Sequence, residues 1–522
     1  MAIPLPPPVT PQQAPLQAVQ AQGSRELLLD YHDIRIHLSG PLLERGGVED
    51  ERLRNGVAGA DSLSDAVRMI GYLYYANGYP ATLVSYAVAG KQDLYVRVVA
   101  GRVHAVHGPQ RLAEYFDDLR DRPVLRDLDL ESDRVLADAL SERAGQDYKP
   151  QLKPDGSADG VVLDLGEPQD KGHRTAAAVD FSNYGNRYSG PYLADAAVRH
   201  SFASGDELSL GGATSVRLLG LGGSGSEPYH EGDLGWSRVT PYGVIGIQGR
   251  YADFRQDVQD SQGNAVRLDG KIGSGGLSWL LPLYSDFRSR LNLLSKADRN
   301  FESIGAGDAG GLLLSQGYNS VETGLSYVRR IQHNEQRFEW SVAVAVRKGL
   351  SRDYSGIAES NLGYFLWRPS FSLRYDLDAH WSFTGEGQAQ LGGSTVPQLE
   401  QFVIGGPTSL HAYETGVGVG DRGEQFRISS GWKDDGDSWL ARHKLRPSVF
   451  VEYGSTELAH PDVGEPAGRV DLADAGAELS LDLTHWLSGT LSAAQPFLHH
   501  GAGDSPDGLQ RKSVFFQVSA KY

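Results

Sequence analysis

The sequence predicts a mainly β protein, in which an antiparallel transmembrane β-barrel of about sixteen strands follows two small α+β domains. Three observations predict this class. Helical periodicity is confined to the first third of the chain, and residues 170–522 are strand-length segments separated by turn residues. Those segments fill about 350 residues, which at ~22 residues per strand and connection gives about sixteen strands. The last segment alternates apolar and polar residues and ends on Tyr522, as a final barrel strand would.

The composition agrees with this class. The mean hydropathy of the 522-residue chain is only −0.36, but a barrel shows just alternate residues to lipid. No run approaches eighteen apolar residues, so a transmembrane helix is not expected. The 64 glycines and 24 tyrosines suit antiparallel strands with interfacial aromatic rings. A net charge of −17 argues against a nucleic-acid partner, and the absence of cysteine excludes disulfides and thiolate metal sites.

Residues 1–26 form a leader rich in Pro and Gln, whose composition cannot build a core. We expect it to be flexible, with a short helix near residues 15–22. A helix of ~14 residues spans ~21 Å, so the leader plugs the barrel partly or not at all. The start of the chain has neither the basic nor the apolar region of a signal peptide, so an exported protein would be read here in its mature or expressed form.

Residues 27–100 predict a first α+β domain of order β-α-α-β-β. Residues 27–40 alternate as a single strand with one buried face. Ser62 and Asp65 can cap an amphipathic helix that ends at Asn77-Gly78. Two strands then follow. The same order recurs more faintly over residues 101–169, which predicts a second domain, and each domain should hold a three-stranded sheet with exposed edges.

Residues 170–522 carry connections of two kinds. Short ones, such as residues 376–379, alternate with long polar ones, such as residues 221–233. This asymmetry is typical of outer-membrane barrels. In the last strand one face holds Val514, Phe516, Val518, Ala520 and Tyr522, while Phe515 breaks the polar alternation of the other face. A soluble sandwich could also end in this way.

Several stretches together resemble one known family. They are residues 74–103, the segment VDFSNYGNRYSGPYLADAAV at 179–198, the segment at 205–210, the glycine-rich loop at 404–423, and PSVFVEYGST at 447–456. With two domains ahead of a barrel, the chain from residue 27 to its end resembles the two-partner secretion transporters of the outer membrane (TpsB type, in the POTRA-plus-barrel superfamily). The resemblance implies POTRA-like periplasmic domains, a loop 404–423 folded into the barrel, and export of a large β-rich partner carrying an N-terminal secretion domain.

Two positions depart from the family pattern. The family's loop motif has Val-Arg-Gly-Tyr where this chain has Leu410-His411-Ala412-Tyr413, and the family's F-x-D-x-G strand has Asp where this chain has Glu452. In the family that Arg and Asp meet inside the barrel. Alternation places Phe450, Glu452 and Gly454 on the lumen face of their strand, so we hypothesise that His411 and Glu452 replace the pair. Such a latch, with Tyr413 beside it, would be weaker than a bidentate one and sensitive to pH near neutrality. The alternative is that His411 merely packs and Glu452 is solvated.

Partner capture is predicted at a sheet edge of the first domain. An exposed edge can add an extended segment as a further strand. The residues predicted for this groove lie on one strand and the neighbouring helix: Thr82, Val84, Tyr86 and Val88, with Val67, Ile70 and Tyr74. The C-terminal residues Phe516, Val518 and Tyr522 are predicted to be the signal read by the barrel-assembly machinery.

No catalytic, metal or cofactor site is predicted. Two segments match the GxGxxG pattern, but neither lies between a strand and a helix, so neither is a nucleotide site. We therefore expect a monomeric, non-enzymatic transporter in the outer membrane of a Gram-negative bacterium. Three alternatives stay open: an insertase that assembles other barrels, a passive porin or surface-binding barrel, and a secreted soluble β-protein.

Overall fold

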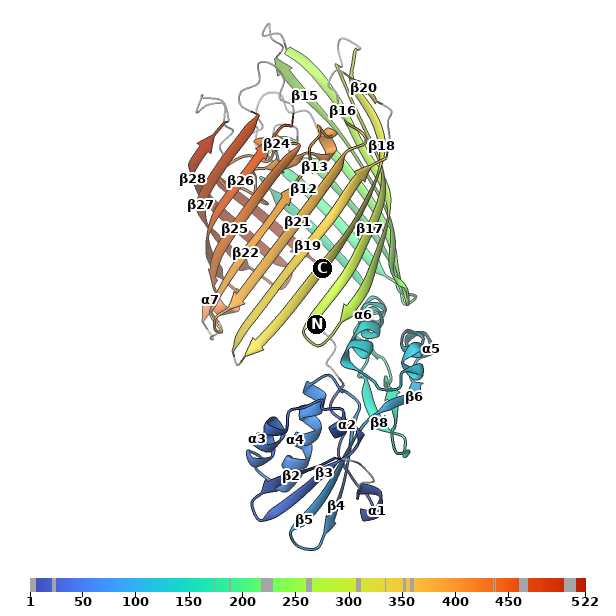
Figure 1. The fold of residues 1–522 in the computed structure, drawn as a ribbon. Helices are drawn as coiled ribbons and strands as arrows, with labels where there is room; N and C mark the ends of the chain where they lie inside the picture. Colours follow the sequence, from blue (N-terminus) through green and yellow to red (C-terminus); the bar gives the residue numbers. More distant parts are fainter. Residues whose placement is uncertain are drawn as a thin grey trace.

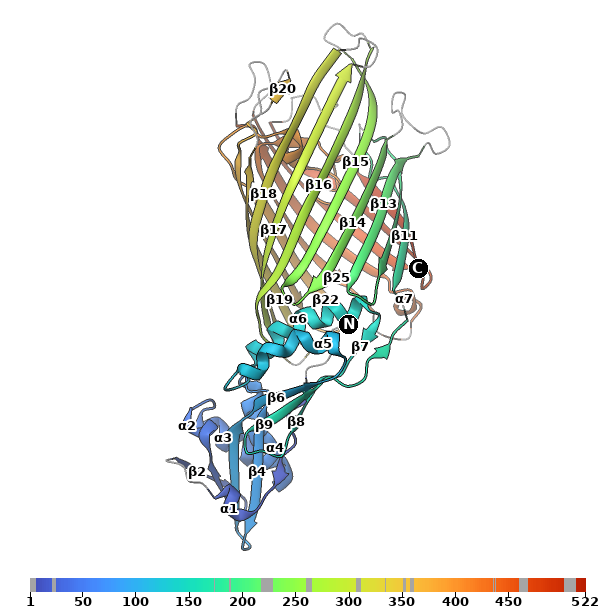
Figure 2. The same ribbon diagram turned by 90° about the vertical axis from the view of Figure 1, so that its right-hand side faces the viewer.

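The protein consists of two small domains attached to one end of a long barrel (Figures 1 and 2). The computed structural model describes residues 6–20, 25–172, 174–186, 189–216, 229–259, 265–306, 311–333, 335–350, 354–356, 361–434, 436, 438–459, 468–501 and 513–522. Part of the predicted long connection 221–233 lies outside these ranges. No helix in them is long and apolar enough to cross a membrane.

The barrel is closed, antiparallel and sixteen-stranded, as predicted. Closure is made by β29, which pairs with β11 over Phe181↔Val518 and its neighbours. A short extra strand, β20 (Tyr354–Gly356), pairs with β18 beyond the end of β19. The sixteen strands are β11 (Thr175–Ser182), β12 (Leu193–Ser201), β13 (Asp206–Ser215), β14 (His230–Thr240), β15 (Gly243–Gln259), β16 (Ala265–Ser285), β17 (Ser289–Ala306), β18 (Gly311–His333), β19 (Gln336–Gly349), β21 (Phe365–Asp376), β22 (Trp381–Gln390), β25 (Arg422–Trp432), β26 (Arg446–Glu457), β27 (Arg469–Asp482), β28 (Leu487–His500) and β29 (Val514–Lys521).

Alternation along the strands separates an apolar outer face from a polar lumen, as a lipid-facing barrel requires. On β26, Val449 and Val451 are 59% and 52% exposed, whereas Phe450 and Glu452, which alternate with them, are 3% and 1% exposed. The same pattern on β29 explains the exception in the C-terminal sequence. Phe515 points inward and is buried, because its ring packs edge-on against His411.

The first domain is a sheet of order β1-β4-β5-β3-β2 covered by helices. Its main helix begins where predicted, since the Ser62 side chain accepts a hydrogen bond from the backbone of Asp65. The elements are β2 (Glu26–Tyr31), β3 (Ile34–Ser39), α2 (Pro41–Glu44), α3 (Asp50–Ala58), α4 (Leu63–Ala76), β4 (Thr82–Ala89) and β5 (Asp93–Ala100).

The single strand predicted over residues 27–40 is wrong. The structure has an antiparallel hairpin there, β2 and β3, which turns at His32-Asp33. His32 adopts a positive φ of 49°, which lets the chain reverse. Leu27, Leu29 and Tyr31 are buried before the turn and Ile36 and Leu38 after it, so the buried face changes phase. The domain therefore has four strands of its own instead of three.

The second domain has the predicted three-stranded sheet, of order β6-β9-β8, and it contacts the barrel rim. The Tyr115 hydroxyl donates to the carbonyl of Val239 at 3.2 Å, and Arg143 donates to the carbonyl of Gly205 and the hydroxyl of Ser237, both at 2.9 Å. Figure 2 shows α6 lying under the end of the barrel that carries the short turns. The elements are β6 (Arg102–His107), α5 (Gln110–Ala113), the 3₁₀ helix η1 (Glu114–Asp121), α6 (Asp127–Arg143), β7 (Gln146–Asp147), β8 (Gln151–Pro154), β9 (Gly160–Asp164) and β10 (Gln169–Asp170).

The leader takes a course that the sequence did not predict. Residues 6–20 lie on the first domain, where β1 (Gln12–Gln13) pairs with β4 and α1 (Leu16–Val19) packs on β4 and β5. The short helix thus lies against the first domain and not in the barrel as a plug. The apolar face it finds there accounts for the difference, because the Val19 side chain is fully buried.

Candidate functional site

The long connection between β22 and β25 enters the barrel. It contains η2 (Gln398–Glu400) and a small hairpin of β23 (Phe402–Ile404) and β24 (Gly418–Gly420). Figure 1 shows β24 within the outline of the barrel near the end opposite the two domains. Ile404, Leu410, Ala412 and Tyr413 are fully buried and share one apolar cluster with Phe450, Leu472 and Ala494 of the wall. This loop is therefore packed against the inside of the barrel.

His411 and Glu452 are in direct contact. The imidazole Nδ1 of His411 lies 2.9 Å from Oε2 and 3.0 Å from Oε1 of Glu452, and the backbone N–H of His411 donates to Oε2 at 2.9 Å. Both residues are almost fully buried. The imidazole also packs on the Phe450 ring, with centroids 4.7 Å apart. Glu452 thus binds the loop through one side-chain contact and one backbone contact.

A guanidinium is present at this site, but it comes from the wall and not from the loop. Arg427 on β25 donates from Nη1 to Oε1 of Glu452 at 2.9 Å, and its Nη2 lies 3.5 Å from Glu478. The same guanidinium lies over the Phe450 ring, 4.4 Å from the centroid. A permanent positive charge therefore faces Glu452 whatever the protonation state of His411.

Two further contacts hold the loop next to His411. The N–H of Ala412 donates to Oδ2 of Asp474 on β27 at 2.7 Å. The Tyr413 hydroxyl donates to the carbonyl of Leu498 on β28 at 3.1 Å. Since Asp474 is the register partner of Glu452 on the next strand, two buried carboxylates lie side by side beneath consecutive loop amides. We call His411, Arg427, Glu452 and Asp474 the latch cluster.

Gly454 has a steric reason to be glycine. A Cβ at this position would lie 2.9 Å from Cδ1 of Leu410 and 3.2 Å from Cγ2 of Ile404. Both contacts are with the loop, so the missing side chain is what allows the loop to lie directly on β26. The three inward residues of the strand, Phe450, Glu452 and Gly454, therefore all contact the loop.

The base of the loop has a second anchor that the sequence did not reveal. Glu400 on η2 accepts two hydrogen bonds from Arg347 at 2.7 Å and one from Arg368 at 2.9 Å. Arg347 also binds Asp298, and the Tyr318 hydroxyl donates to Glu400 at 3.3 Å. The Glu400 side chain is 3% exposed, so this is a buried ion network between the loop and strands β17 to β21.

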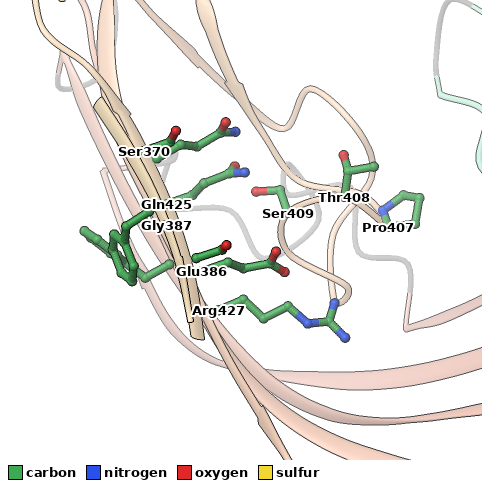
Figure 3. Close-up of a pocket in the computed structure, with 12 residues that line it drawn as sticks. Ser370, Glu386, Gly387, Pro407, Thr408, Ser409, Gln425 and Arg427 are labelled. Carbon is green, nitrogen blue, oxygen red and sulfur yellow. The ribbon is translucent and has the colours of Figure 1, made fainter. Parts of the chain in front are cut away.

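A polar cavity of about 340 Å³ separates the loop tip from the adjacent wall strands β21, β22 and β25. Figure 3 shows Pro407, Thr408 and Ser409 of the loop on one side of it and Gln425 and Ser370 of the wall on the other. The loop is thus pinned to β26–β28 and at its base, while its tip at Pro407–Ser409 is separated from β21, β22 and the middle of β25 by this cavity. Hydroxyl and amide groups line the gap that remains.

The groove predicted on the first domain is present only at one end. A cavity of about 310 Å³ is lined there by Val67, Tyr86 and Val88 together with Leu63 and Leu94. The other predicted residues are core: Thr82, Val84, Ile70 and Tyr74 are buried, and burial raises the pKa of Tyr74 to about 12. These four assignments are corrected, because α4 packs on the first half of β4 and only the second half of β4 borders the cavity.

The three C-terminal residues predicted as an assembly signal lie on the outer face of β29 or at its end. Val518 is 41% and Tyr522 is 89% exposed, while the Phe516 ring packs against Phe181 of β11 with centroids 5.8 Å apart. Their recognition by an assembly machinery stays a prediction. Among the described residues no cluster of potential metal ligands is found.

Sequence reasoning missed Arg427, Asp474 and Glu400. Alternation does put Arg427 on the lumen face of β25, opposite Phe426 and Ile428, but lumen-facing arginine is ordinary in a barrel. Asp474 follows a β-bulge at Ala473, which has no sequence signal here. Only the register of neighbouring strands brings these side chains together.

A family of known proteins matches this chain. The family profile described as "Haemolysin secretion/activation protein ShlB/FhaC/HecB" matches residues 162–481, more than half of the chain. A search of curated protein sequences gives no significant match.

Two solved structures share the fold. CdiB from Escherichia coli is 15% identical with a TM-score of 0.68, and the alignment covers 96% of this chain and 92% of that one. CdiB from Acinetobacter baumannii is 14% identical with a TM-score of 0.59, and the alignment covers 98% and 92% of the two chains. At these identities the likeness is one of fold.

Proposed function

Because the chain belongs to the ShlB/FhaC/HecB family of two-partner secretion transporters, we propose that it exports one large, β-rich partner protein from the periplasm to the cell surface. Its barrel is an outer-membrane barrel, and the two POTRA-like domains would lie in the periplasm. The partner would carry an N-terminal secretion domain. No step in this proposal needs a cofactor.

One observation carries the proposal. The loop of residues 391–421 is folded inside the closed barrel and is bound to the wall through two buried ion clusters, centred on Glu452 and Glu400. A buried charge pair is stable as long as both partners stay, and breaking it costs several kcal/mol. Loop and wall would therefore behave as a discrete closed state, from which the passing partner displaces the loop.

Capture of the partner is assigned to the first domain. The second half of β4 and the cavity beside it could receive an extended segment as an added strand in place of β1. The cavity walls are mainly aliphatic, so an apolar side chain on alternate residues of that segment would fit them. The second domain, held against the rim by Tyr115 and Arg143, would fix this groove relative to the barrel mouth.

Secretion tests the proposal. We expect a large repetitive exoprotein to be encoded beside this chain, and co-expression of both in a Gram-negative host should release it into the medium. An exoprotein without its secretion domain is the control. If the barrel reaches the outer membrane, shown by heat-modifiable gel mobility, and the exoprotein still stays in the periplasm, the proposal is wrong.

The alternatives predict other results. An insertase would change the assembly of other barrels when it is depleted. A passive porin would show a steady conductance in planar bilayers that is unaffected by the exoprotein.

A further inference from the structure

The leader lies on the free edge of β4, the same edge that the proposed function offers to the partner. Gln12 and Gln13 pair in parallel with Ser85 and Tyr86, and the N–H of Ala14 donates to the carbonyl of Tyr86 at 3.0 Å. The outermost position of the first sheet is thus taken by a segment of the same chain.

The leader is bound along its whole described length. The Tyr75 hydroxyl donates to the carbonyl of Pro6 at 3.0 Å, and Arg97 donates to the carbonyl of Ala18 at 3.2 Å. Val9 is 6% exposed and packs in the second domain's core cluster, and Val19 is fully buried. The leader therefore binds the domain as a peptide ligand would, through a buried apolar side chain near each end and a short paired strand between them.

The leader also closes the partner groove. Thr10 and Pro11 line the 310 Å³ cavity together with Val67, Tyr86 and Val88. An extended segment could not pair with β4 at Ser85 and Tyr86 while β1 is there. Covering a free edge in this way also protects the sheet from unwanted pairing.

The strand pairing itself is short. β1 has two residues, whereas β4 has eight. A partner strand that pairs along all of β4 would form more ladder hydrogen bonds than β1 does, and it would add a side chain to the cavity. The leader can therefore be replaced by a longer strand without any change in the core of the domain.

We propose that residues 6–20 are a built-in competitor for the partner's strand: they occupy the β4 edge at rest and are displaced by an extended, apolar segment of the exported protein. This inference rests on the proposed export function. The partner's segment can bind only while the leader is off the edge. Its apparent affinity for β4 therefore equals its intrinsic affinity multiplied by the fraction of molecules in which the edge is free. Segments that pair weakly are thereby rejected.

A disulfide tests the competition in the full chain, which has no cysteine of its own. Gln12→Cys with Ser85→Cys joins two residues that are register partners on neighbouring strands, at a spacing that a disulfide can bridge. Oxidation should stop secretion of the exoprotein, and reduction should restore it. The matched control is Arg35→Cys with Asp93→Cys, a parallel pair in the same sheet away from the leader, which should secrete in both states. Unchanged secretion by the oxidised leader pair would overturn the inference.

A second test needs no exoprotein. A labelled synthetic peptide of residues 6–20 is titrated onto detergent-solubilised full-length protein. Val19→Asp introduces an uncompensated charge at the anchor, and Ala14→Pro removes the N–H that binds Tyr86 without touching the packed side chains. Both variants should bind the peptide ~10-fold or more tightly than the unaltered chain, in which the edge is occupied. Equal binding by all three proteins would contradict the competition.

The two tests separate this inference from the export function. If the peptide binds the variants but no exoprotein is secreted under any condition, the occupied edge stands and the export function fails. If the oxidised leader pair secretes normally, export stands and the competition fails.

Discussion

Arg427 and Glu452 are register partners on neighbouring strands β25 and β26, and the guanidinium Nη1 donates to the carboxylate Oε1 at 2.9 Å directly beside His411. The wall thus carries its own ion pair, and the loop is added to it through His411. In the family motif the positive charge comes from the loop. Here it comes from the wall, and the loop supplies an imidazole and a backbone N–H.

Removal of the wall charge should release the loop. Arg427→Gln leaves Glu452 buried with no permanent counter-charge, at a cost of about 3–5 kcal/mol. In a Ser409→Cys background, maleimide labelling of the loop should accelerate ~100-fold or more. Arg330→Gln is the control, because its ion pair with Glu339 is exposed and contributes little. Equal labelling rates in the two variants would show that Arg427 does not hold the loop.

Exchanging His411 and Arg427 with each other should leave the loop bound, whereas replacing only one of them should not. His411→Arg alone forces a larger side chain into the buried space between the Phe450 and Phe515 rings, beside Arg427, and should loosen the loop. The double variant His411→Arg/Arg427→His restores one of each and should label at nearly the original rate. The coupling between the two positions should exceed about 1 kcal/mol in a double-mutant cycle. Additive effects would mean that the two side chains act independently.

A methyl group on Gly454 should lift the loop from the wall. Gly454→Ala puts a Cβ 2.9 Å from Leu410, and relief of that clash costs about 1–3 kcal/mol. Proteolysis within the loop should become faster. Gly385→Ala is the matched control, since a Cβ on that barrel glycine meets nothing within 4 Å. A cleavage rate for Gly454→Ala as low as that of Gly385→Ala would contradict the packing argument.

The second domain should lose stability as the pH rises. Burial, followed by the neighbouring Asp118 carboxyl, raises the pKa of Asp133 on α6 from 3.8 to about 9. The folded domain therefore favours the neutral acid, and its stability falls as the pH rises from about 4 toward 9. At pH 8, Asp133→Asn should raise the free energy of opening of α6, measured by amide hydrogen exchange, by about 1–2 kcal/mol relative to the unaltered chain. Below pH 4 this gain should vanish.

The control for this effect is Asp117→Asn, on an exposed carboxylate of the adjacent 3₁₀ helix, whose exchange should match the unaltered chain at every pH. A gain for Asp133→Asn that is the same at pH 4 and pH 8 would exclude titration of this carboxyl as the cause.

Local patterns predicted the strand faces well. The alternation around Glu452 placed it in the lumen, and the structure has it 1% exposed directly after the lipid-facing Val451. The hairpin of β2 and β3 was missed because alternating residues continue through the turn at His32, and a two-residue turn without glycine has a weak signal. The docking of the leader on the first domain was not predicted, because its composition shows only that it cannot fold alone and says nothing about what it can bind.

By itself the sequence determined the barrel class, the two preceding domains and the inward direction of Glu452, because a period of two residues and a helical stripe are properties of neighbouring residues. Only the tertiary structure decided that Arg427 and Asp474 join His411 and Glu452, and that the leader covers the edge of β4. Those contacts join segments far apart in the chain. They depend on strand register, on a β-bulge and on the docking of the leader, and a pattern along one strand contains none of the three.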